Sequence, residues 1–178
     1  MTPWKRLARR TVYERRPWLA VHVDRLELPG GRIVEEFHQV EVAPYVIVLA
    51  ETPAGELVMM EQYRHGVGGL CLSLPGGMID PGEEPEVAAR RELLEETGYR
   101  AEHFRLVQTY VAMANMGGCT AHLFHAANAV PVTAPDSGDL EEAELLTLSR
   151  GDVRAAIQAG RLPIANILMA AGLWLAGF

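Results

Sequence analysis

The stretch from Gly77 to Tyr99 constrains the fold more than any other part of the chain. Its second half predicts a helix, because Pro85 suits a first helical turn, where its missing N–H is not needed, and Gly98 stands where a glycine ends a helix. At about 100° per residue, three glutamates share one side of this helix, and the apolar residues, by which the helix is expected to pack, lie broadly on the other. The two sets are Glu92, Glu95 and Glu96, and Val87, Leu93 and Leu94.

Three carboxylates on one side of a helix need a counter-charge. Glu92 and Glu96 are like charges four residues apart, which costs roughly 0.2–0.5 kcal/mol in an isolated helix. Arg91 can offset part of this cost through Glu95, while a hard cation such as Mg²⁺ offsets more, because it takes oxygen ligands and keeps waters that a phosphate can replace. A solvated acidic face is the alternative for the glutamates alone. The paired glycines before the helix favour a ligand site, because they let a ligand approach the backbone closely.

The spacing of this stretch resembles the Nudix box of the Nudix hydrolases. Gly77 is followed after five residues by Glu83, after seven more by Arg91-Glu92-Leu93, and then by Glu95-Glu96 and Gly98-Tyr99. Seven specified residues at about 6% each match by chance in fewer than about one such chain in a million. Tyr99 departs from the family, which usually has an aliphatic residue there. The resemblance implies an α/β (α+β) fold, a Nudix-type α/β/α sandwich with a mixed β-sheet.

Composition limits the classes of partner. The net charge of −7 argues against nucleic acid, whereas bound metal ions would still admit a phosphate substrate. The two cysteines imply no disulfide framework and favour a reducing cytoplasm. The longest apolar stretch, 164–178, is too short to span a bilayer, so we expect no membrane partner. One interpretation of the basic N-terminus is a transit peptide, but Trp4, Glu14 and Pro17 favour folded structure there.

Hydrophobic alternation divides the chain into an N-terminal β-sheet region, 1–43, and a main domain, 44–178. The segments 18–28 and 32–42 alternate loosely around a Pro-Gly-Gly turn and predict a hairpin or meander. A sheet of this size is not stable alone, so it must pack on the main domain or on a second subunit. Further strands are expected at 45–50, 57–63, 104–113, 121–127 and 145–148, a glycine turn at 115–119, and helices at 152–159 and 163–176.

The rest of the chain resembles the ADP-ribose pyrophosphatase branch of the family. The resemblance rests on the N-terminal segment 4–31, on Glu61-Gln62-Tyr63-Arg64-His65-Gly66, on the loop 115–118 and on the acidic stretch 139–144. It implies hydrolysis of the pyrophosphate bond of a nucleoside diphosphate sugar, with ADP-ribose giving AMP and ribose 5-phosphate. Met116 stands where this superfamily commonly has a loop proline that indicates the substrate. GDP-mannose, NADH and nucleoside triphosphates stay open as substrates, and an inert nucleotide-sensing module stays open as an alternative from another class.

The resemblance also implies roles for individual residues. Glu92, Glu95, Glu96 and the carbonyl of Gly76 are expected to bind Mg²⁺, with Mn²⁺ as the alternative. Expected catalytic residues are Glu95, as ligand or base, Glu141, as the base from the late acidic loop, and Arg91, which with Glu83 orients the helix carboxylates. Glu142 and Glu144 are alternatives to Glu141.

Substrate contacts are expected at Arg64, Gly77 and Trp18. An arginine at a strand end is also often a plain surface charge, which is the alternative for Arg64. The resemblance implies a homodimer with exchanged N-terminal sheets, in which Trp18 or Tyr13 stacks on the nucleotide base.

Overall fold

The chain forms two compact units in a computed structural model that describes residues 2–136, 138 and 142–178. The first unit contains residues 1–44 and 110–120, and the second contains 45–109 and 121–178. The division therefore falls one residue beyond the predicted boundary and adds 110–120 to the N-terminal region. It passes through two long strands, β8 (His103–Ala112) and β9 (Gly117–Ala127).

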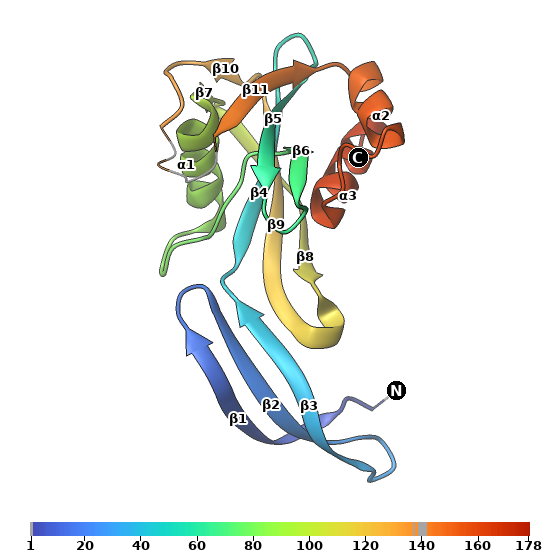
Figure 1. The fold of residues 1–178 in the computed structure, drawn as a ribbon. Coiled ribbons are helices and arrows are strands. Elements are labelled where there is room, and N and C mark those ends of the chain that lie inside the picture. The colour runs from blue at the N-terminus through green and yellow to red at the C-terminus, as the bar shows by residue number, and fades with distance from the viewer. Residues whose placement is uncertain (1, 137, 139–141) are drawn as a thin grey trace. The chain divides into compact units, whose positions relative to one another are not determined.

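An antiparallel three-stranded sheet makes up most of the first unit (Figure 1). Its central strand pairs with both neighbours along nearly its whole length. The start of β9, Gly117 and Gly118, runs parallel to Val40 and Glu41 of the third strand. The three strands are β1 (Lys5–Arg15), β2 (Leu19–Glu27) and β3 (Ile33–Val42).

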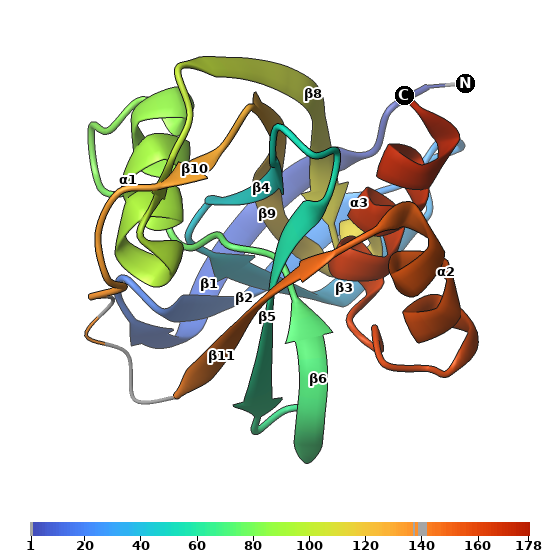
Figure 2. The same ribbon diagram turned by 90° about the horizontal axis from the view of Figure 1, so that it is seen from above.

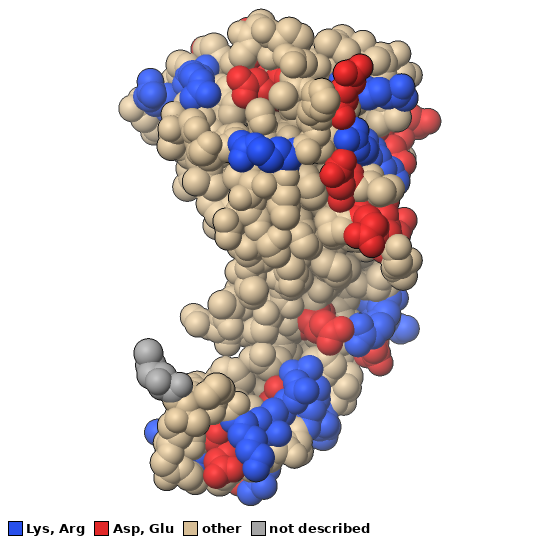
Figure 3. Space-filling view, turned by 180° about the vertical axis from the view of Figure 1, so that it is seen from behind, with Lys and Arg blue, Asp and Glu red and all other residues tan. Residues whose placement is uncertain are grey.

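The basic N-terminal segment is itself strand β1, which hydrophobic alternation did not predict. Its charges find partners on the other two strands: Arg9 binds Asp24 of β2 through two hydrogen bonds of 2.7 and 2.8 Å, and Arg10 lies 3.9 Å from Glu36 of β3. Figure 3 shows basic and acidic side chains interleaved on the face that it draws. Because β1 is held by backbone pairing and ion pairs and is exposed along most of its length, it has no apolar period to reveal it.

A mixed sheet forms the centre of the second unit. β4 runs parallel to β9, with Tyr45 opposite Ala121 and Glu51 opposite Ala127, and β4 also pairs with β5 in the antiparallel direction. β5 pairs with β6 and β11 on its two sides, and β8 pairs with β9. The remaining strands of this sheet are β4 (Tyr45–Glu51), β5 (Leu57–Arg64), β6 (Gly69–Ser73) and β11 (Ala143–Leu148); a separate pair is β7 (Tyr99–Arg100) with β10 (Val130–Pro131).

Helices cover both faces of this sheet (Figures 1 and 2). α1 (Pro85–Thr97) packs on the face that carries Val46 and Val48. α2 (Arg150–Gln158) and α3 (Ala165–Ala176) lie on the other side, where Trp174 of α3 donates a hydrogen bond to Glu51. The Nudix-type α/β/α sandwich is therefore confirmed. No helix in the described part of the chain has both the length and the hydropathy to cross a bilayer.

Two local predictions were wrong. Val87 is 55% exposed rather than packed on the sheet, because the small residues Ala88 and Ala89 take the positions that meet the sheet. The segment 115–119 is not a simple glycine turn, because a short 3₁₀ helix, Ala114–Met116, precedes β9, which begins at Gly117. In both cases the local sequence allows more than one structure, and contacts with the rest of the fold determine which one forms.

Candidate active site

In the second unit, helix α1 follows a loop that contains Pro75, Gly76 and Gly77, and backbone contacts hold both in place. Pro85 occupies the first turn of α1 as predicted, and Gly98 ends the helix with φ of 70°. The loop lies along β4, because Val48 N–H donates to the Pro75 carbonyl at 2.8 Å and Val46 N–H donates to the Gly77 carbonyl at 2.9 Å. The loop backbone is thereby held next to the glutamates of α1.

The paired glycines let two carboxylates approach the loop backbone. Gly76 N–H donates to Glu96 Oε2 at 2.7 Å. A Cβ atom at Gly76 would overlap the Val46 carbonyl oxygen, and one at Gly77 would overlap the carboxylate of Glu92. Close packing against backbone therefore requires glycine at position 76, whereas a Cβ at position 77 would displace the carboxylate of Glu92.

Arg91 joins the remaining acidic side chains. Its Nε and Nη2 donate to the two oxygens of Glu83 at 3.0 and 2.9 Å, and its Nη1 donates to Glu92 at 2.7 Å and to Glu95 at 3.2 Å. Its Nη2 also donates to the Met78 carbonyl at 3.0 Å. The bonds to Glu83 are the main cause that raises the pKa of Arg91, and the same bonds lower the pKa of Glu83.

Replacing Arg91 by Met is expected to lower the free energy of unfolding by about 2 kcal/mol, because it leaves the half-buried carboxylates of Glu83 and Glu92 without their counter-charge. Denaturant unfolding monitored by circular dichroism measures this loss. Arg154→Met, at an exposed position of α2, is the matched control and should change stability by less than about 0.5 kcal/mol. Equal losses in the two variants would contradict a central role for Arg91.

The Arg91–Glu83 pair also predicts a pH dependence of stability. Because Arg91 lowers the pKa of Glu83 in the folded chain, the stabilisation is present above the ordinary value of 4.5 and is lost as pH falls through the lowered value. The difference in unfolding free energy between wild type and Glu83→Gln should therefore shrink steadily as pH falls below 4.5. Urea titrations between neutral pH and pH 3 would test this, and a difference that stays constant would exclude it.

The predicted metal ligands form two groups in this conformation. Glu92 and Glu95 share Arg91, with side chains 12% and 44% exposed, while Glu96 accepts from Gly76. Within the described ranges, no three acidic, histidine or cysteine side chains converge closely enough to hold a metal ion. Their chemistry nevertheless fits a hard divalent cation, since all three are carboxylates beside a glycine-lined backbone.

Arg64 lies at the end of β5, partly buried. Successive side chains on a strand alternate between faces, and Val58 of β5 belongs to the core that packs on α1. Arg64, six residues later, therefore shares the face of the sheet that α1 covers.

The other predicted residues lie elsewhere or outside the description. Trp18 and Tyr13 belong to the first unit and are 63% and 51% exposed. Met116 ends the 3₁₀ helix and is 47% exposed. Glu141 lies outside the described residues, whereas its alternative Glu144 is an exposed residue of β11 opposite Glu61.

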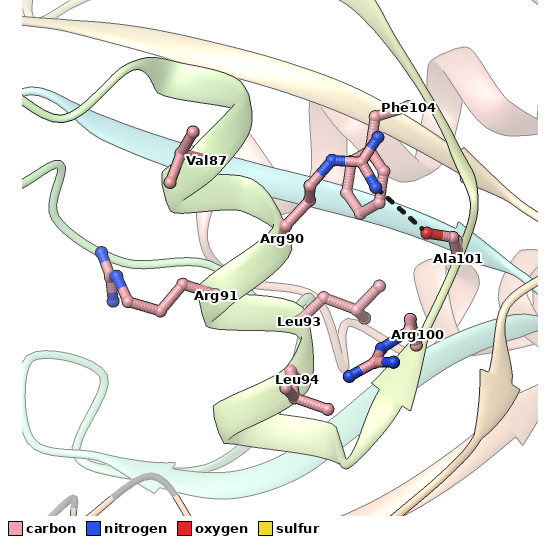
Figure 4. A pocket seen from close by; sticks show the side chains of 8 residues that line it. All are labelled: Val87, Arg90, Arg91, Leu93, Leu94, Arg100, Ala101 and Phe104. Atoms are coloured by element: carbon pink, nitrogen blue, oxygen red, sulfur yellow. Dashed lines mark hydrogen bonds between the residues drawn. The ribbon is translucent and has the colours of Figure 1, made fainter.

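A pocket of about 330 Å³ lies on another side of α1, between the helix and the segment 100–104 (Figure 4). The Arg90 guanidinium stacks over the Phe104 ring at 4.3 Å and donates to the Ala101 carbonyl at 3.2 Å. In Figure 4 the Arg91 side chain points away from Arg90, Arg100 and Phe104. Arg91 also lines this pocket, while its guanidinium binds Glu83, Glu92 and Glu95.

The family follows from comparison with known proteins. A model described as the NUDIX domain matches residues 40–164, which is more than half of the chain. The chain belongs to the NUDIX family. A second model, the nucleoside diphosphate sugar hydrolase N-terminal domain, matches residues 4–40. The NUDIX match spans the loop and α1, and the second match covers β1, β2 and most of β3.

Curated relatives share about a third of their aligned residues with this NUDIX chain. A CMP-5'-(N-acetyl-N-hydroxy-3-aminopropyl)phosphonate hydrolase from Streptomyces rubellomurinus is 36% identical over 74% of this chain and 63% of its own length. An ADP-sugar pyrophosphatase from Mus musculus is 34% identical over 58% of this chain and 50% of its own. An ADP-ribose pyrophosphatase from Bacillus subtilis is 33% identical over 58% and 56%. The matches thus span half to two thirds of the relatives.

A solved structure extends the fold comparison to nearly the whole chain. The crystal structure of an ADP compounds hydrolase has a TM-score of 0.85, with 20% sequence identity, over 99% of this chain and 96% of that chain. At this identity the likeness supports the NUDIX fold alone.

Two site features were absent from the sequence interpretation. The Met78 carbonyl holds Arg91, and no sequence signal marks a backbone acceptor. Gln62 is 4% exposed beside Ser73, which is 2% exposed. The alternation Val58, Met60, Gln62 along β5 could have placed this amide on the core face.

Proposed function

We propose that this chain hydrolyses the pyrophosphate bond of a nucleoside diphosphate sugar, with ADP-ribose and water giving AMP and ribose 5-phosphate. The observation that carries the proposal is the arrangement of three α1 glutamates around Arg91 and the Gly76 amide. The mouse and Bacillus subtilis relatives are an ADP-sugar pyrophosphatase and an ADP-ribose pyrophosphatase, which supports the substrate class. Substitution at phosphorus depends mainly on positioning and charge stabilisation, which such a cluster can supply.

A divalent metal, Mg²⁺ or Mn²⁺, is part of the proposal. Glu92, Glu95, Glu96 and the Gly76 carbonyl are the proposed ligands. The Gly76 N–H donates to Glu96, so the Gly76 backbone lies beside one of the proposed carboxylate ligands. When bound, the metal supplies positive charge that stabilises the pyrophosphate oxygens and lowers the pKa of water.

The chain's own residues perform the remaining tasks. Arg91 holds Glu92 and Glu95 in place, as residues behind metal ligands commonly do. Glu95, the more exposed of the two, is a candidate to accept the proton of the attacking water. Glu141 is the other candidate base, with Glu142 and Glu144 as alternatives.

Arg64, Gly77 and Trp18 are the proposed substrate contacts, and the region 1–43 is the proposed dimer-forming part of a homodimer. The exposure of β1, Tyr13 and Trp18 supports this assignment, because a three-stranded sheet with so much uncovered surface gains stability from a partner. Light scattering at micromolar concentration should give twice the chain mass, and a monomer would contradict the dimer. Two cysteines, buried and outside any disulfide, fit the cytoplasmic location that we propose.

A hydrolysis panel tests the function. With Mg²⁺, we expect AMP and ribose 5-phosphate from ADP-ribose, and no turnover after chelation by EDTA. The panel also contains GDP-mannose, NADH and a nucleoside triphosphate, since Met116 departs from the loop proline of the family. A CMP-linked aminoalkylphosphonate is included because the Streptomyces relative is named for such a substrate. Preference for another member would replace ADP-ribose, and failure of every member with both metals would favour the inert sensing module.

A further inference from the structure

Gln62 is a polar side chain buried within the strongly apolar strand β5. It is 4% exposed, in a strand where Leu57, Val58, Met59 and Met60 are at most 1% exposed. Burial of an amide is costly unless its polar atoms are hydrogen-bonded. Its contacts therefore indicate why the position tolerates this residue.

The contacts of the Gln62 amide are with Arg64 and Ser73. A guanidinium has only donors, so the amide atom that faces it must be the oxygen. In this orientation Gln62 Oε1 accepts from Arg64 Nε at 3.0 Å, from Arg64 Nη2 at 2.5 Å and from Ser73 Oγ at 2.6 Å. The opposite orientation would bring the amide nitrogen against guanidinium donors. One buried oxygen thus binds one edge of the Arg64 guanidinium.

The two side chains lie on the same face of the sheet. They are two residues apart on β5, and the alternation places both on the side of Val58, which packs against α1. Ser73, at the end of β6, lies in the strand paired with β5. The adjacent strand β6 therefore supports the amide that binds Arg64.

We propose that Gln62 is a positioning residue that fixes the Arg64 guanidinium on the α1 face of the sheet, ready to bind the diphosphate of the substrate. The substrate part of this inference rests on the proposed function. Arginine has a long, flexible side chain, and holding it in one rotamer before binding reduces the entropy lost when the anion binds. Gln62 is too buried to serve as a general surface contact, so its effect passes through Arg64.

The first test observes Arg64 without any substrate. In ¹⁵N-arginine NMR spectra the Arg64 Nε–H signal, assigned from its loss in Arg64→Lys, should exchange slowly with water. Gln62→Met, which keeps the length but removes the acceptor, should speed that exchange at least about tenfold, whereas Gln62→Glu, which keeps an acceptor, should retain slow exchange. An unchanged signal in a folded Gln62→Met protein would overturn the positioning role, whether or not ADP-ribose is hydrolysed.

The second test is a double-mutant cycle in the hydrolysis assay. Gln62→Met should raise KM for ADP-ribose about tenfold with a smaller change in kcat, and Gln62→Glu should stay within about threefold of wild type. In an Arg64→Met background, Gln62→Met should have no further effect. Gln108→Met, at an exposed position of β8, is the matched control. Additive losses would contradict action through Arg64, while absence of ADP-ribose turnover in wild type would refute the proposed substrate and leave the NMR result to decide the role of Gln62.

Discussion

Glu96→Gln is expected to lower kcat/KM for ADP-ribose by about a thousandfold or more, because it removes one carboxylate from the proposed metal site. The substitution keeps the shape of the side chain and one oxygen that can still accept a hydrogen bond from Gly76 N–H. In the wild-type chain Gly76 N lies 2.7 Å from Glu96 Oε2. We therefore expect little change in the melting temperature. Steady-state hydrolysis with Mg²⁺, together with thermal unfolding, separates the loss of charge from loss of structure.

Glu86→Gln is the matched control for Glu96→Gln. Glu86 lies on the same helix but pairs with Arg90 on the pocket side, where its carboxylate is exposed. An exposed i,i+4 ion pair contributes only about 0.3–0.5 kcal/mol, so activity should stay within about twofold of wild type. A comparable decrease of kcat/KM in the two variants, or full activity in Glu96→Gln, would contradict a role for Glu96 as a metal ligand.

Gly76→Ala is expected to lower the free energy of unfolding by about 3 kcal/mol or more, because the added methyl group meets backbone that cannot move aside. The nearest atoms are the carbonyl oxygen of Val46 and the Cα of Ile47, both in β4. Gly76 also has φ of 156°, where L-residues with a Cβ are uncommon. Relief of this clash requires separation of the loop from β4, which would also pull Gly76 N–H away from Glu96.

Gly66→Ala provides the control for Gly76→Ala. A Cβ at Gly66, in the turn after β5, meets no atom within 4 Å. Its stability should change by less than about 0.5 kcal/mol, with a small gain expected from the reduced freedom of the unfolded chain. Chemical denaturation of both variants measures the contrast. Equal stability of Gly76→Ala and wild type would show that the loop does not need its close contact with β4.

Helix α1 shows which part of the site was predictable. Its first residue, its terminal glycine and the common side of Glu92, Glu95 and Glu96 all follow from local rules, since capping and the period of 3.6 residues depend only on neighbours within the helix. The contact of Arg91 with Glu95, four residues later, is predictable for the same reason. Strands with a buried face, such as β4 and β5, were also predictable from their apolar residues.

Tertiary structure decided where those side chains found their partners. The sequence grouped the three glutamates together, but the fold divides them between Arg91 and the amide of Gly76, twenty residues earlier in the chain. It also placed Ala88 and Ala89 rather than Val87 against the sheet, because close helix packing favours small residues at the contact.

Strand β1 and the Gln62–Ser73 contact, which joins β5 to β6, also depend on tertiary structure. β1 has no apolar alternation, so its identity as a strand depends on pairing with β2 and on ion pairs such as Arg9–Asp24. The sequence by itself determined the helix, its charged side and the family, because these depend on residues a few positions apart. Only the tertiary structure decided which backbone groups meet the charges, as Gly76 meets Glu96, because those contacts join segments that only folding brings together.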